Sequence, residues 1–565
     1  MKILLVYPHV LHERVNEEDV SVPPIGIYYV GAVLKEAGHE VEILNTHPLK
    51  NRPGQIERVV RDWRPELVGF SVLHANRWGA VDIARMIKRV LPRVHVVFGG
   101  IGATSLWDQL LRDVPDLDYV VLGEGERTFL ELANSLESGR TDGLEFIKGL
   151  AFRRGGEPFD TGGAPPIGDL DSLPNPARYF TYNHVAATRG CAMKCSFCGS
   201  PEFWGREVRA HSPEYFVEQL ELLYQKGVRF FYFSDDTFTA DRRRVLAIAR
   251  LILEKGLRIT WFAIARVDHV DEEMLRWMRR AGCIQISYGV ESGSPEVRKR
   301  LGKPLREETI VKAFSMTARA GILPRAYFIY GCPGETDASI EETLALIRKI
   351  RPLAAIFYIL EIFPGTALHD ELARAGRLDP GVWRKRLENI SYFELDPAIG
   401  RDKVVAWGRR LREGFYGELG RIARTLETEA GCPEDAALYG DFLSRLAMTF
   451  SHGDYSRVEA VLEKEKVAET LYEKALALTP DHRAFLGLSV LKQKQGDHEG
   501  AVRLLEQGLR HFPGSDQLGV CLGLSLMNLG RLRTALEVFE GFPDSGEARA
   551  RAENCRGLLS GQSTP

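Results

Sequence analysis

The sequence predicts an α/β protein with an N-terminal doubly wound, Rossmann-like domain, a partial (β/α)6 barrel and a C-terminal all-α region of helical repeats. Short apolar runs that alternate with amphipathic stretches predict the first two parts, and self-similarity near the C-terminus predicts the third. We divide the chain accordingly into five segments. They are a first α/β domain at 1–150, a linker at 151–180, the barrel at 181–395, a helical connector at 396–464 and the repeat region at 465–565.

The composition is that of a soluble globular protein, because 44% of the 565 residues are hydrophobic and 27% are charged. Lys and Arg number 74 and Asp and Glu 77, so the formal charge of -3 predicts no bulk attraction to nucleic acid or to an anionic membrane. No apolar run reaches the ~18 residues of a membrane helix, and the run at 3–7 is too short for a signal peptide. We therefore expect a cytoplasmic protein. The 8 cysteines are too few for a disulfide scaffold, so clustered cysteines are candidate ligands or catalysts.

The first domain carries small or polar residues where its predicted strands end. Its apolar runs, at 2–8, 39–45, 67–73, 94–100 and 118–126, alternate with helical stretches at 25–38 and 78–91. Ligands of doubly wound sheets bind outside the carboxyl ends of the strands. The residues at those ends are Ser71, Gly99, Gly100, Gly123, Glu124, Gly125 and Glu126. Glycine lets backbone approach a large flat or phosphorylated ligand, although ordinary tight turns use it equally. No G-x-G-x-x-G follows the first strand, so a dinucleotide site is not predicted.

A cysteine loop follows a stretch at 153–177 that is rich in Gly, Pro and Asp and is interpreted as interdomain chain. Cys191, Cys195 and Cys198 form C-x3-C-x2-C, with Phe197 before the last cysteine. Three thiolates can bind one face of a cubane iron–sulfur cluster and leave its fourth iron open, which is typical of a catalytic metal. The alternatives are a zinc loop or three incidental thiols, but zinc sites usually add a second cysteine pair or histidines at ligand spacing.

The barrel is predicted from six apolar runs, at 186–189, 229–234, 258–264, 284–290, 325–331 and 355–362. Functional residues of such barrels lie at the carboxyl ends of the strands. The candidates there are Asp235, Asp236, Glu291 and Gly331. Asp235 and Asp236 are sequence neighbours, so their side chains point apart and do not predict a shared two-carboxylate site. Asp236 is equally compatible with capping the next helix.

The C-terminal region repeats with a period of 34 residues, which separates Gly496 from Gly530 and Ala501 from Ala535. This pattern resembles tetratricopeptide repeats. Stacked helix pairs leave a concave surface, so a docking surface for a protein partner or for a second copy of the chain is one interpretation. A stabilising helical cap is the other.

Several segments resemble cobalamin-dependent radical SAM enzymes. Those at 22–44, 67–72, 96–100 and 118–132 resemble the cobalamin-binding domain, and the cysteine loop with the segments at 234–239, 288–303 and 328–336 resembles the radical SAM core. The resemblance implies a [4Fe–4S] cluster on the three cysteines and cobalamin against the strand-end residues of the first domain. It implies S-adenosylmethionine bound by Phe197, Asp235, Asp236, Glu291 and Gly331. The D-x-H-x-x-G motif of many B12 proteins is missing, and His47 stands in N-T-H-P-L instead, which implies a corrin without a protein histidine on cobalt.

The function that this resemblance favours is methylation of an unactivated carbon, with methylcobalamin as the donor and a 5′-deoxyadenosyl radical as the hydrogen-abstracting species. Cyclisation or rearrangement of the tetrapyrrole-ring-forming type is the second hypothesis, and a non-catalytic cluster-bearing adaptor is the third. A flavodoxin- or ferredoxin-like electron donor is implied. The substrate stays open between small molecules, lipids and peptides; the aromatic runs at 261–269 and 356–363 suit an apolar substrate but are equally interpreted as barrel core.

Overall fold

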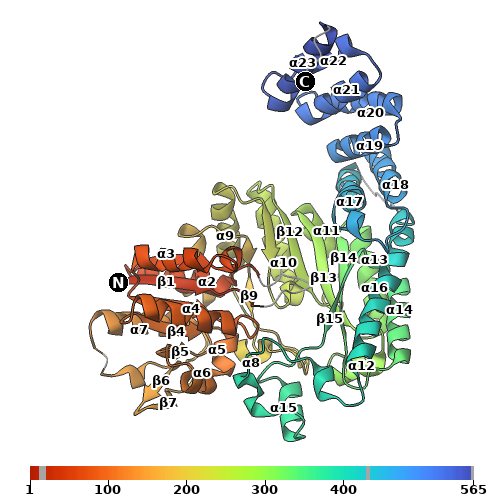
Figure 1. Ribbon diagram of the computed structural model, residues 1–565. Coiled ribbons are helices and arrows are strands. Elements are labelled where there is room, and N and C mark those ends of the chain that lie inside the picture. Colours follow the sequence, from red (N-terminus) through yellow and green to blue (C-terminus); the bar gives the residue numbers. More distant parts are fainter. Residues whose placement is uncertain (12–20, 141, 428–432, 561–565) are drawn as a thin grey trace. The chain divides into compact units, whose positions relative to one another are not determined.

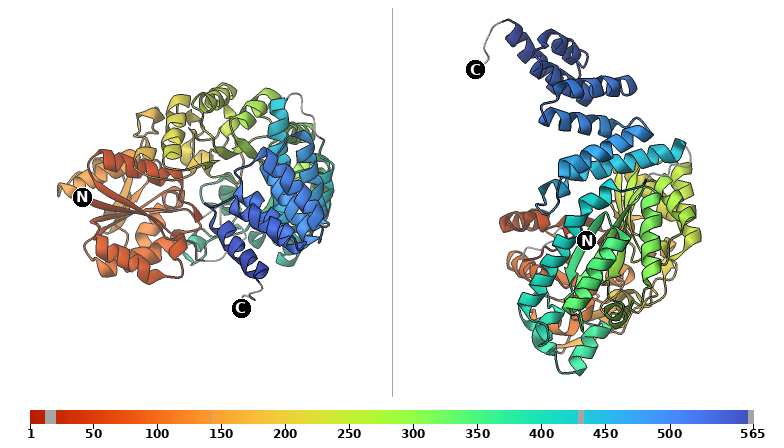
Figure 2. Two further views of the ribbon diagram at one scale, coloured as in Figure 1. Left: turned by 90° about the horizontal axis from the view of Figure 1, so that it is seen from above. Right: turned by 90° about the vertical axis from the view of Figure 1, so that its right-hand side faces the viewer.

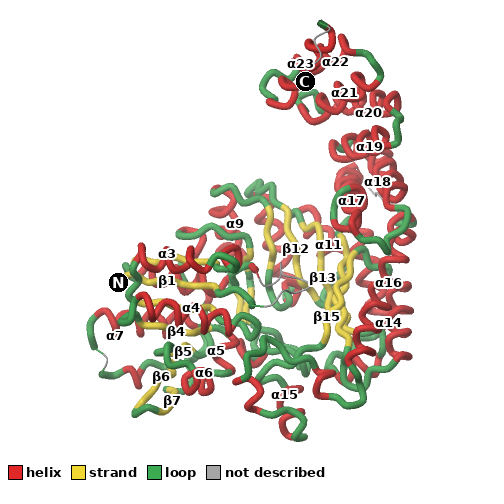
Figure 3. Tube along the Cα trace, viewed as in Figure 1, coloured by secondary structure: helices red, strands yellow, loops and turns green. Residues whose placement is uncertain are grey.

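The computed structural model describes residues 1–11, 21–140, 142–427 and 433–560 (Figure 1). It divides into two compact units. The first unit comprises residues 1–310, 327–343 and 356–408, and the second comprises 311–326, 344–355 and 409–565. Figure 3 shows strands and helices mixed in the first part of the chain and helices alone in the last part. Among the described helices, none combines the length and the hydropathy of a membrane span.

The N-terminal domain is a doubly wound sheet, as predicted. Its parallel part has the strand order β2-β1-β3-β4-β5. The strands are β1 (Lys2–Tyr7), β2 (Glu40–Asn45), β3 (Leu67–Ser71), β4 (His95–Gly99) and β5 (Tyr119–Val121). The helices are α2 (Ile25–Glu36), α3 (Pro53–Trp63), α4 (Arg77–Val90), α5 (Ile101–Ser105), α6 (Trp107–Asp113) and α7 (Gly125–Glu137). Figure 2 shows helices on both faces of this sheet.

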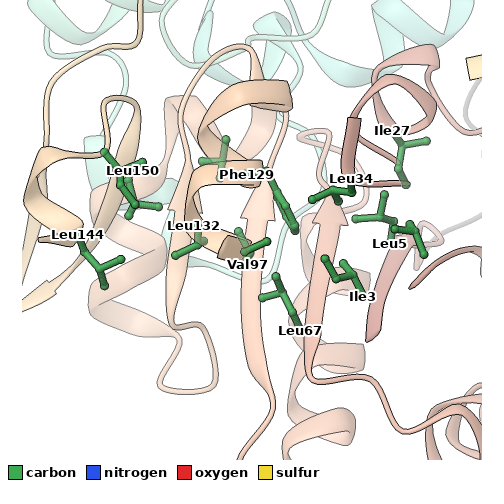
Figure 4. Packing of buried hydrophobic residues seen from close by; sticks show 14 of the residues in the cluster. Ile3, Leu5, Ile27, Leu34, Leu67, Val97, Phe129, Leu132, Leu144 and Leu150 are labelled. Carbon is green, nitrogen blue, oxygen red and sulfur yellow. The ribbon is translucent and has the colours of Figure 1, made fainter. Parts of the chain in front are cut away.

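Alternate residues of each strand pack against helices on opposite faces of the sheet, because successive side chains of a strand point to opposite faces. Ile3 and Leu5 of β1 pack in one cluster with residues of α2 and α7, among them Leu34 and Phe129 (Figure 4). The inner strands β1, β3 and β4 are therefore mostly apolar and buried, as parallel strands covered on both faces are, whereas the edge strand β2 exposes Glu40 and Glu42. Strand β5 is shorter than the run predicted at 118–126, because the chain turns at Gly123 with φ of +70° and α7 begins at Gly125.

Part of the predicted linker belongs to this sheet instead. Strand β6 (Leu150–Arg154) pairs antiparallel with β5, and β7 (Glu157–Asp160) pairs antiparallel with β6. Gly155 and Gly156 connect the two strands with φ of +62° and +89°. A two-residue hairpin turn of type I′ needs positive φ at both central residues, so this Gly-Gly pair was a hairpin signal within the stretch interpreted as interdomain chain.

The second sheet is the partial barrel, with strand order β15-β14-β13-β12-β11-β8. Its strands are β8 (His184–Val185), β11 (Phe230–Phe233), β12 (Thr260–Ala265), β13 (Cys283–Glu291), β14 (Leu323–Tyr330) and β15 (Ala354–Ile359). Six strands were predicted, but the first was placed wrongly at 186–189. The chain leaves the sheet after Val185, and β9 (Thr188–Arg189) pairs antiparallel with β10 (Arg209–Ala210).

The aromatic runs are only partly core. In β12, Trp261, Ala263 and Ala265 are buried, whereas Phe262 and Ile264 on the other face are half-buried. In β15 residues 356–359 are all half-buried, without the alternation seen in β12.

The described part of the C-terminal region contains helices and no strands, as predicted. Consecutive helices from α17 to α23 pack on each other, and next-but-one pairs among them also pack. These helices are α17 (Pro433–Ser451), α18 (Lys464–Leu478), α19 (His482–Lys494), α20 (His498–His511), α21 (Asp516–Asn528), α22 (Leu532–Glu540) and α23 (Gly546–Leu559). Gly496 and Gly530 both have positive φ just after a helix end, at α19 and α21, and Ala501 and Ala535 are both fully buried. Residues one period apart thus occupy equivalent places, while assignment to the tetratricopeptide family stays a prediction.

Candidate functional site

A cavity of about 580 Å³ lies at the carboxyl ends of the parallel strands of the first sheet. The turns after β3, β4 and β5 form one side, and residues of the cysteine loop and of the barrel form the other. The lining is mostly apolar, and the volume is that of a site for a small molecule or cofactor, roughly 300–1,000 Å³. All seven strand-end residues that the sequence singled out in the first domain line it. They are Ser71, Gly99, Gly100, Gly123, Glu124, Gly125 and Glu126.

Two of these glycines show why a side chain is excluded here. Gly100 has φ of +92°, and a Cβ at this position would lie 2.8 Å from the carbonyl oxygen of Val72. Gly123 has φ of +70°, and a Cβ there would meet open space. At these two glycines the wall is therefore backbone alone, which a flat ligand can approach closely.

The cysteine loop runs between β9 and β10, and α8 (Ser200–Trp204) follows its last cysteine. Cys191, Cys195 and Cys198 are all free and half-buried, as is Phe197. Burial raises the pKa of Cys198 to about 11 and also raises the pKa of Cys195. Without a metal, these thiols therefore favour the protonated form. Bound iron would reverse this preference, because a metal cation favours the thiolate.

The middle of the loop is held by the barrel. The Ser196 N–H donates to the Leu301 carbonyl at 3.0 Å, and the Ser196 carbonyl accepts from the Leu368 N–H at 2.8 Å. Gly302 has φ of +69°, and a Cβ there would lie 2.6 Å from the Lys194 carbonyl oxygen. Among the described residues no three His, Cys, Asp or Glu side chains are placed to share a single metal ion. A cubane cluster, in contrast, takes each thiolate on a different iron.

The two neighbouring aspartates have different surroundings. Asp235 is 1% exposed, and its Oδ1 accepts from the Ala187 N–H at 3.0 Å and the Thr188 hydroxyl at 2.6 Å. Its Oδ2 is buried without a hydrogen-bond partner, and burial raises the pKa of Asp235 to about 6. Asp236 lines the cavity and accepts from the Ser200 hydroxyl at 2.7 Å. It does not cap the next helix, α10 (Arg242–Glu254), because Asp241 does so.

Glu291 and Gly331 lie at the ends of β13 and β14. Glu291 has φ of +68° and forms a buried ion pair with Lys303, at 2.6 Å. The Gly331 N–H donates to Glu335 Oε2 at 2.5 Å, and the Cys332 N–H donates to the same oxygen at 3.0 Å. Burial raises the pKa of Glu335 to about 7. Glu335 is the last residue of the G-C-P-G-E run at 331–335. The sequence prediction named Gly331 from this run and missed Glu335. Cys332 is fully buried, as expected for a small apolar side chain.

Glu124 and Glu126 line the cavity but direct carboxylate oxygens to arginines. Glu124 Oε1 lies 2.6 Å from Arg189 Nη1, and Glu124 Oε2 lies 2.7 Å from Arg209 Nη1. Glu126 Oε1 lies 2.6 Å from Arg189 Nη2. Burial alone would raise the pKa of Glu124, but hydrogen bonds from Arg209, Arg189 and the Ile167 N–H bring it below its usual value. Sequence reasoning missed both arginines, which flank the cysteine loop. We call these four side chains the clamp.

Two histidines of the first domain differ in their position relative to this cavity. His47 stacks on Tyr7, with ring centroids 5.3 Å apart, and does not line the cavity, whereas His74 does. The Ser105 hydroxyl donates to the Ile101 carbonyl and therefore accepts from His74 Nε2, at 2.8 Å. Burial lowers the pKa of His74 to about 3, so the ring is neutral with its proton on Nε2. His74 was not a candidate, because it matches no motif.

These features fit the cofactors that the family resemblance implies. Bare backbone and a mostly apolar wall suit a flat macrocycle. Three half-buried thiols on a loop beside that wall suit a cluster with one open iron.

Comparisons with known proteins agree with this family resemblance. Residues 15–133 match the B12 binding domain model and residues 185–347 match the radical SAM superfamily model. An uncharacterized methyltransferase of Pyrococcus horikoshii is 30% identical over 411 residues, which is 71% of this chain and 88% of that protein. The anaerobic magnesium-protoporphyrin IX monomethyl ester cyclase of Cereibacter sphaeroides is 29% identical over 66% of this chain and 64% of its own. The methyltransferase TsrM of Kitasatospora setae, solved with cobalamin and a [4Fe–4S] cluster, shares the fold with a TM-score of 0.61 at 18% identity, covering 84% of this chain and 99% of its own.

Because both domain models match in the predicted order, the chain is an enzyme that uses a [4Fe–4S] cluster, S-adenosylmethionine and cobalamin, and it needs an electron donor. It belongs to the radical SAM enzymes that carry a B12-binding domain.

Proposed function

We propose that the protein transfers a methyl group to an unactivated carbon of its substrate. One observation carries this proposal: a single cavity is bounded by the glycine-edged turns of the B12-binding domain and by α8, which directly follows the cysteine loop. A methyl donor bound at the turns and a radical source bound at the loop would both face this space. The Pyrococcus relative, whose name includes methyltransferase, also matches more of this chain than the cyclase does.

The cluster cysteines in this proposal are Cys191, Cys195 and Cys198, which leave one iron for the amino and carboxylate groups of S-adenosylmethionine. When bound, the cluster and S-adenosylmethionine together would supply a hydrogen-abstracting 5′-deoxyadenosyl radical, and the corrin would supply the methyl group.

The barrel residues would hold S-adenosylmethionine in different ways. Asp236 borders the cavity directly and Glu291 presents a carboxylate paired with Lys303. Asp235 acts through the residues it holds, Ala187 and Thr188. Phe197 and Gly331 complete the proposed contacts.

Aromatic side chains would help to exclude water from the reacting groups. Phe203 and Trp204 of α8 and Phe363 after β15 bring aromatic rings to the cavity wall. Such a wall protects a carbon radical from competing reactions and strengthens the electrostatic contacts inside the site.

Anaerobic reconstitution with iron, sulfide and hydroxocobalamin tests this assignment. We expect a desalted four-iron protein with about one corrin per chain, measured by iron analysis and visible absorption. Cys195→Ala should lose the cluster and the cleavage of S-adenosylmethionine. Cys521→Ala, in α21, is the matched control and should keep both. An iron-replete Cys195→Ala variant that still cleaves S-adenosylmethionine would contradict the assignment.

Methyl transfer is separable from cyclisation by its co-products. Methylation forms S-adenosylhomocysteine when the corrin is remethylated and 5′-deoxyadenosine when hydrogen is abstracted, whereas cyclisation forms only the second. We expect both products from the reduced holoenzyme. 5′-Deoxyadenosine alone would favour cyclisation or rearrangement. A flavodoxin- or ferredoxin-like donor, a cytoplasmic location and a docking or self-association role for the helical tail stay predictions.

A further inference from the structure

Both ends of the cysteine loop are fastened to one turn of the B12-binding domain. Arg189 in β9 and Arg209 in β10 are direct partners in the antiparallel pair that closes the loop at its base. Glu124 joins the two arginines with its two carboxylate oxygens, and Glu126 binds the second amino group of Arg189. Because Glu124 and Glu126 also line the cavity, the clamp connects the cofactor-facing turn with the base of the loop.

The clamp is balanced in charge and closed to solvent. Arg189 and Arg209 are each 7% exposed, and like charges directly opposite each other in a sheet repel. Two carboxylates offset two guanidinium groups, so the arrangement is stable only while all four side chains keep their places. A planar guanidinium that binds two carboxylates has a fixed direction, which a lysine does not provide.

Aromatic rings hold the same guanidinium from two further elements. The Arg189 guanidinium carbon lies 5.1 Å from the ring centroid of Tyr29 in α2 and 5.3 Å from that of Trp204 in α8. Trp204 belongs to the helix that follows Cys198, so Arg189 contacts the loop's own continuation as well as the first domain. The attraction between a cation and the face of an aromatic ring is stronger when the cation is desolvated, as Arg189 is here.

We infer that Arg189 is a positioning residue that sets the separation between the cluster on the cysteine loop and the corrin over the turn at 123–126. The inference rests on the proposed function, since it needs both cofactors at these places. Asp235 holds the adjacent residues from the barrel side and the Leu301 carbonyl holds the middle of the loop. Arg189 therefore joins the base of the loop to Glu124 and Glu126 of the B12-binding domain, a connection that the barrel contacts do not make.

The test measures the magnetic interaction between the reduced cluster and cob(II)alamin in the holoenzyme by pulsed electron paramagnetic resonance. Arg189→Met removes the link, and Glu126→Gln keeps the side-chain shape while removing one charge. Arg178→Met is the matched control, because Arg178 forms an exposed ion pair with Glu218 in the same unit. We expect one narrow distance for the wild type and the control. Both clamp variants should retain iron and corrin and give a distribution at least about twofold broader, with Arg189→Met the broader.

Every outcome of this distance measurement either supports or overturns the inference. Unchanged distributions in cofactor-replete variants overturn the inference alone, whereas a wild type that binds no corrin overturns the proposed function and the inference with it. Loss of iron or corrin from both clamp variants would also overturn it, because the clamp would then retain a cofactor and not position it. Hydrogen exchange supplies a readout independent of activity: peptides covering 123–133 and 190–208 should exchange faster together in Arg189→Met. Faster exchange in only one of them contradicts the link.

Discussion

Two of the sets of contacts that join the B12-binding domain to the rest of the first unit differ in chemistry. The clamp consists of Glu124, Glu126, Arg189 and Arg209, whose side chains are 3–8% exposed. The strap, which we define as residues 383–388, lies against α4. Its Arg386 pairs with Asp82, whose side chains are 53% and 35% exposed, and its Arg384 pairs with Asp113 at 3.0 Å.

The strap also uses backbone oxygens where the clamp uses carboxylates. The Trp78 indole N–H donates to the Leu387 carbonyl at 3.0 Å, and Arg77 Nη1 donates to the Glu388 carbonyl at 3.3 Å. The ion pairs of Arg384 and Arg386 are exposed and keep most of their hydration, so each tolerates loss of one partner. Buried charges have given theirs up, so loss of one clamp partner leaves the others uncompensated. The clamp therefore fixes geometry, while the strap adds attachment.

The largest expected effect follows from removing the clamp's central cation. Arg189→Met leaves two buried carboxylates with a single guanidinium, which should lower the free energy of unfolding by about 3–5 kcal/mol. The midpoint of urea unfolding measures this, with Arg178→Met as control at less than about 1 kcal/mol. Equal losses in the two variants would show that burial does not distinguish the clamp.

Local signals predicted the parts of the site that bind through backbone or short motifs. The cysteine spacing and the strand-end glycines are legible because three thiols or a bare turn require neighbouring residues of fixed type. The inner strands of the first sheet were likewise predictable, since their side chains are mostly apolar and buried on both faces.

The clamp could not be predicted in this way. Glu124 and Arg189 are 65 positions apart, and no periodic pattern connects them. The carboxylates at 124 and 126 were chosen for position in a strand end, but their partners depend on how two domains pack. The first barrel strand was misplaced for a similar reason, because Asp235 binds Ala187 and Thr188 and takes the chain out of the sheet. The hairpin at Gly155 and Gly156, in contrast, carried its own local signal.

A smaller expected effect is that the contribution of the clamp to the free energy of unfolding depends on pH more strongly than that of the strap. The pKa of Glu124 in the folded protein is below its usual value, so its ion pairs stabilise the folded state above that usual value and are lost as the pH falls through the folded-state pKa. The free energy of unfolding of the wild type should therefore fall between about pH 5 and pH 3, near and below the ordinary value for Glu. Glu124→Gln should be less stable at pH 7 and should show a shallower fall.

The strap provides the comparison for this acid dependence. Arg386→Met should keep the wild-type slope, because its Asp82 partner is half-exposed. A slope that flattens in Arg386→Met and not in Glu124→Gln would place the acid-sensitive contact in the strap.

The smallest expected effect is that of salt on the strap. Arg386→Met should cost less than about 1 kcal/mol at low ionic strength, part of it from contact with the Trp78 ring at 5.7 Å. Raising the salt from 0.1 M to 1 M shortens the screening length from about 10 Å to about 3 Å, so the ionic part of this cost should vanish. The cost of Arg189→Met should persist, because ions do not reach side chains this buried. Urea unfolding of both variants and the wild type at the two salt concentrations measures the difference. If the two costs shrank in parallel, solvent would reach the clamp, and its pairing could not set the position of the cysteine loop.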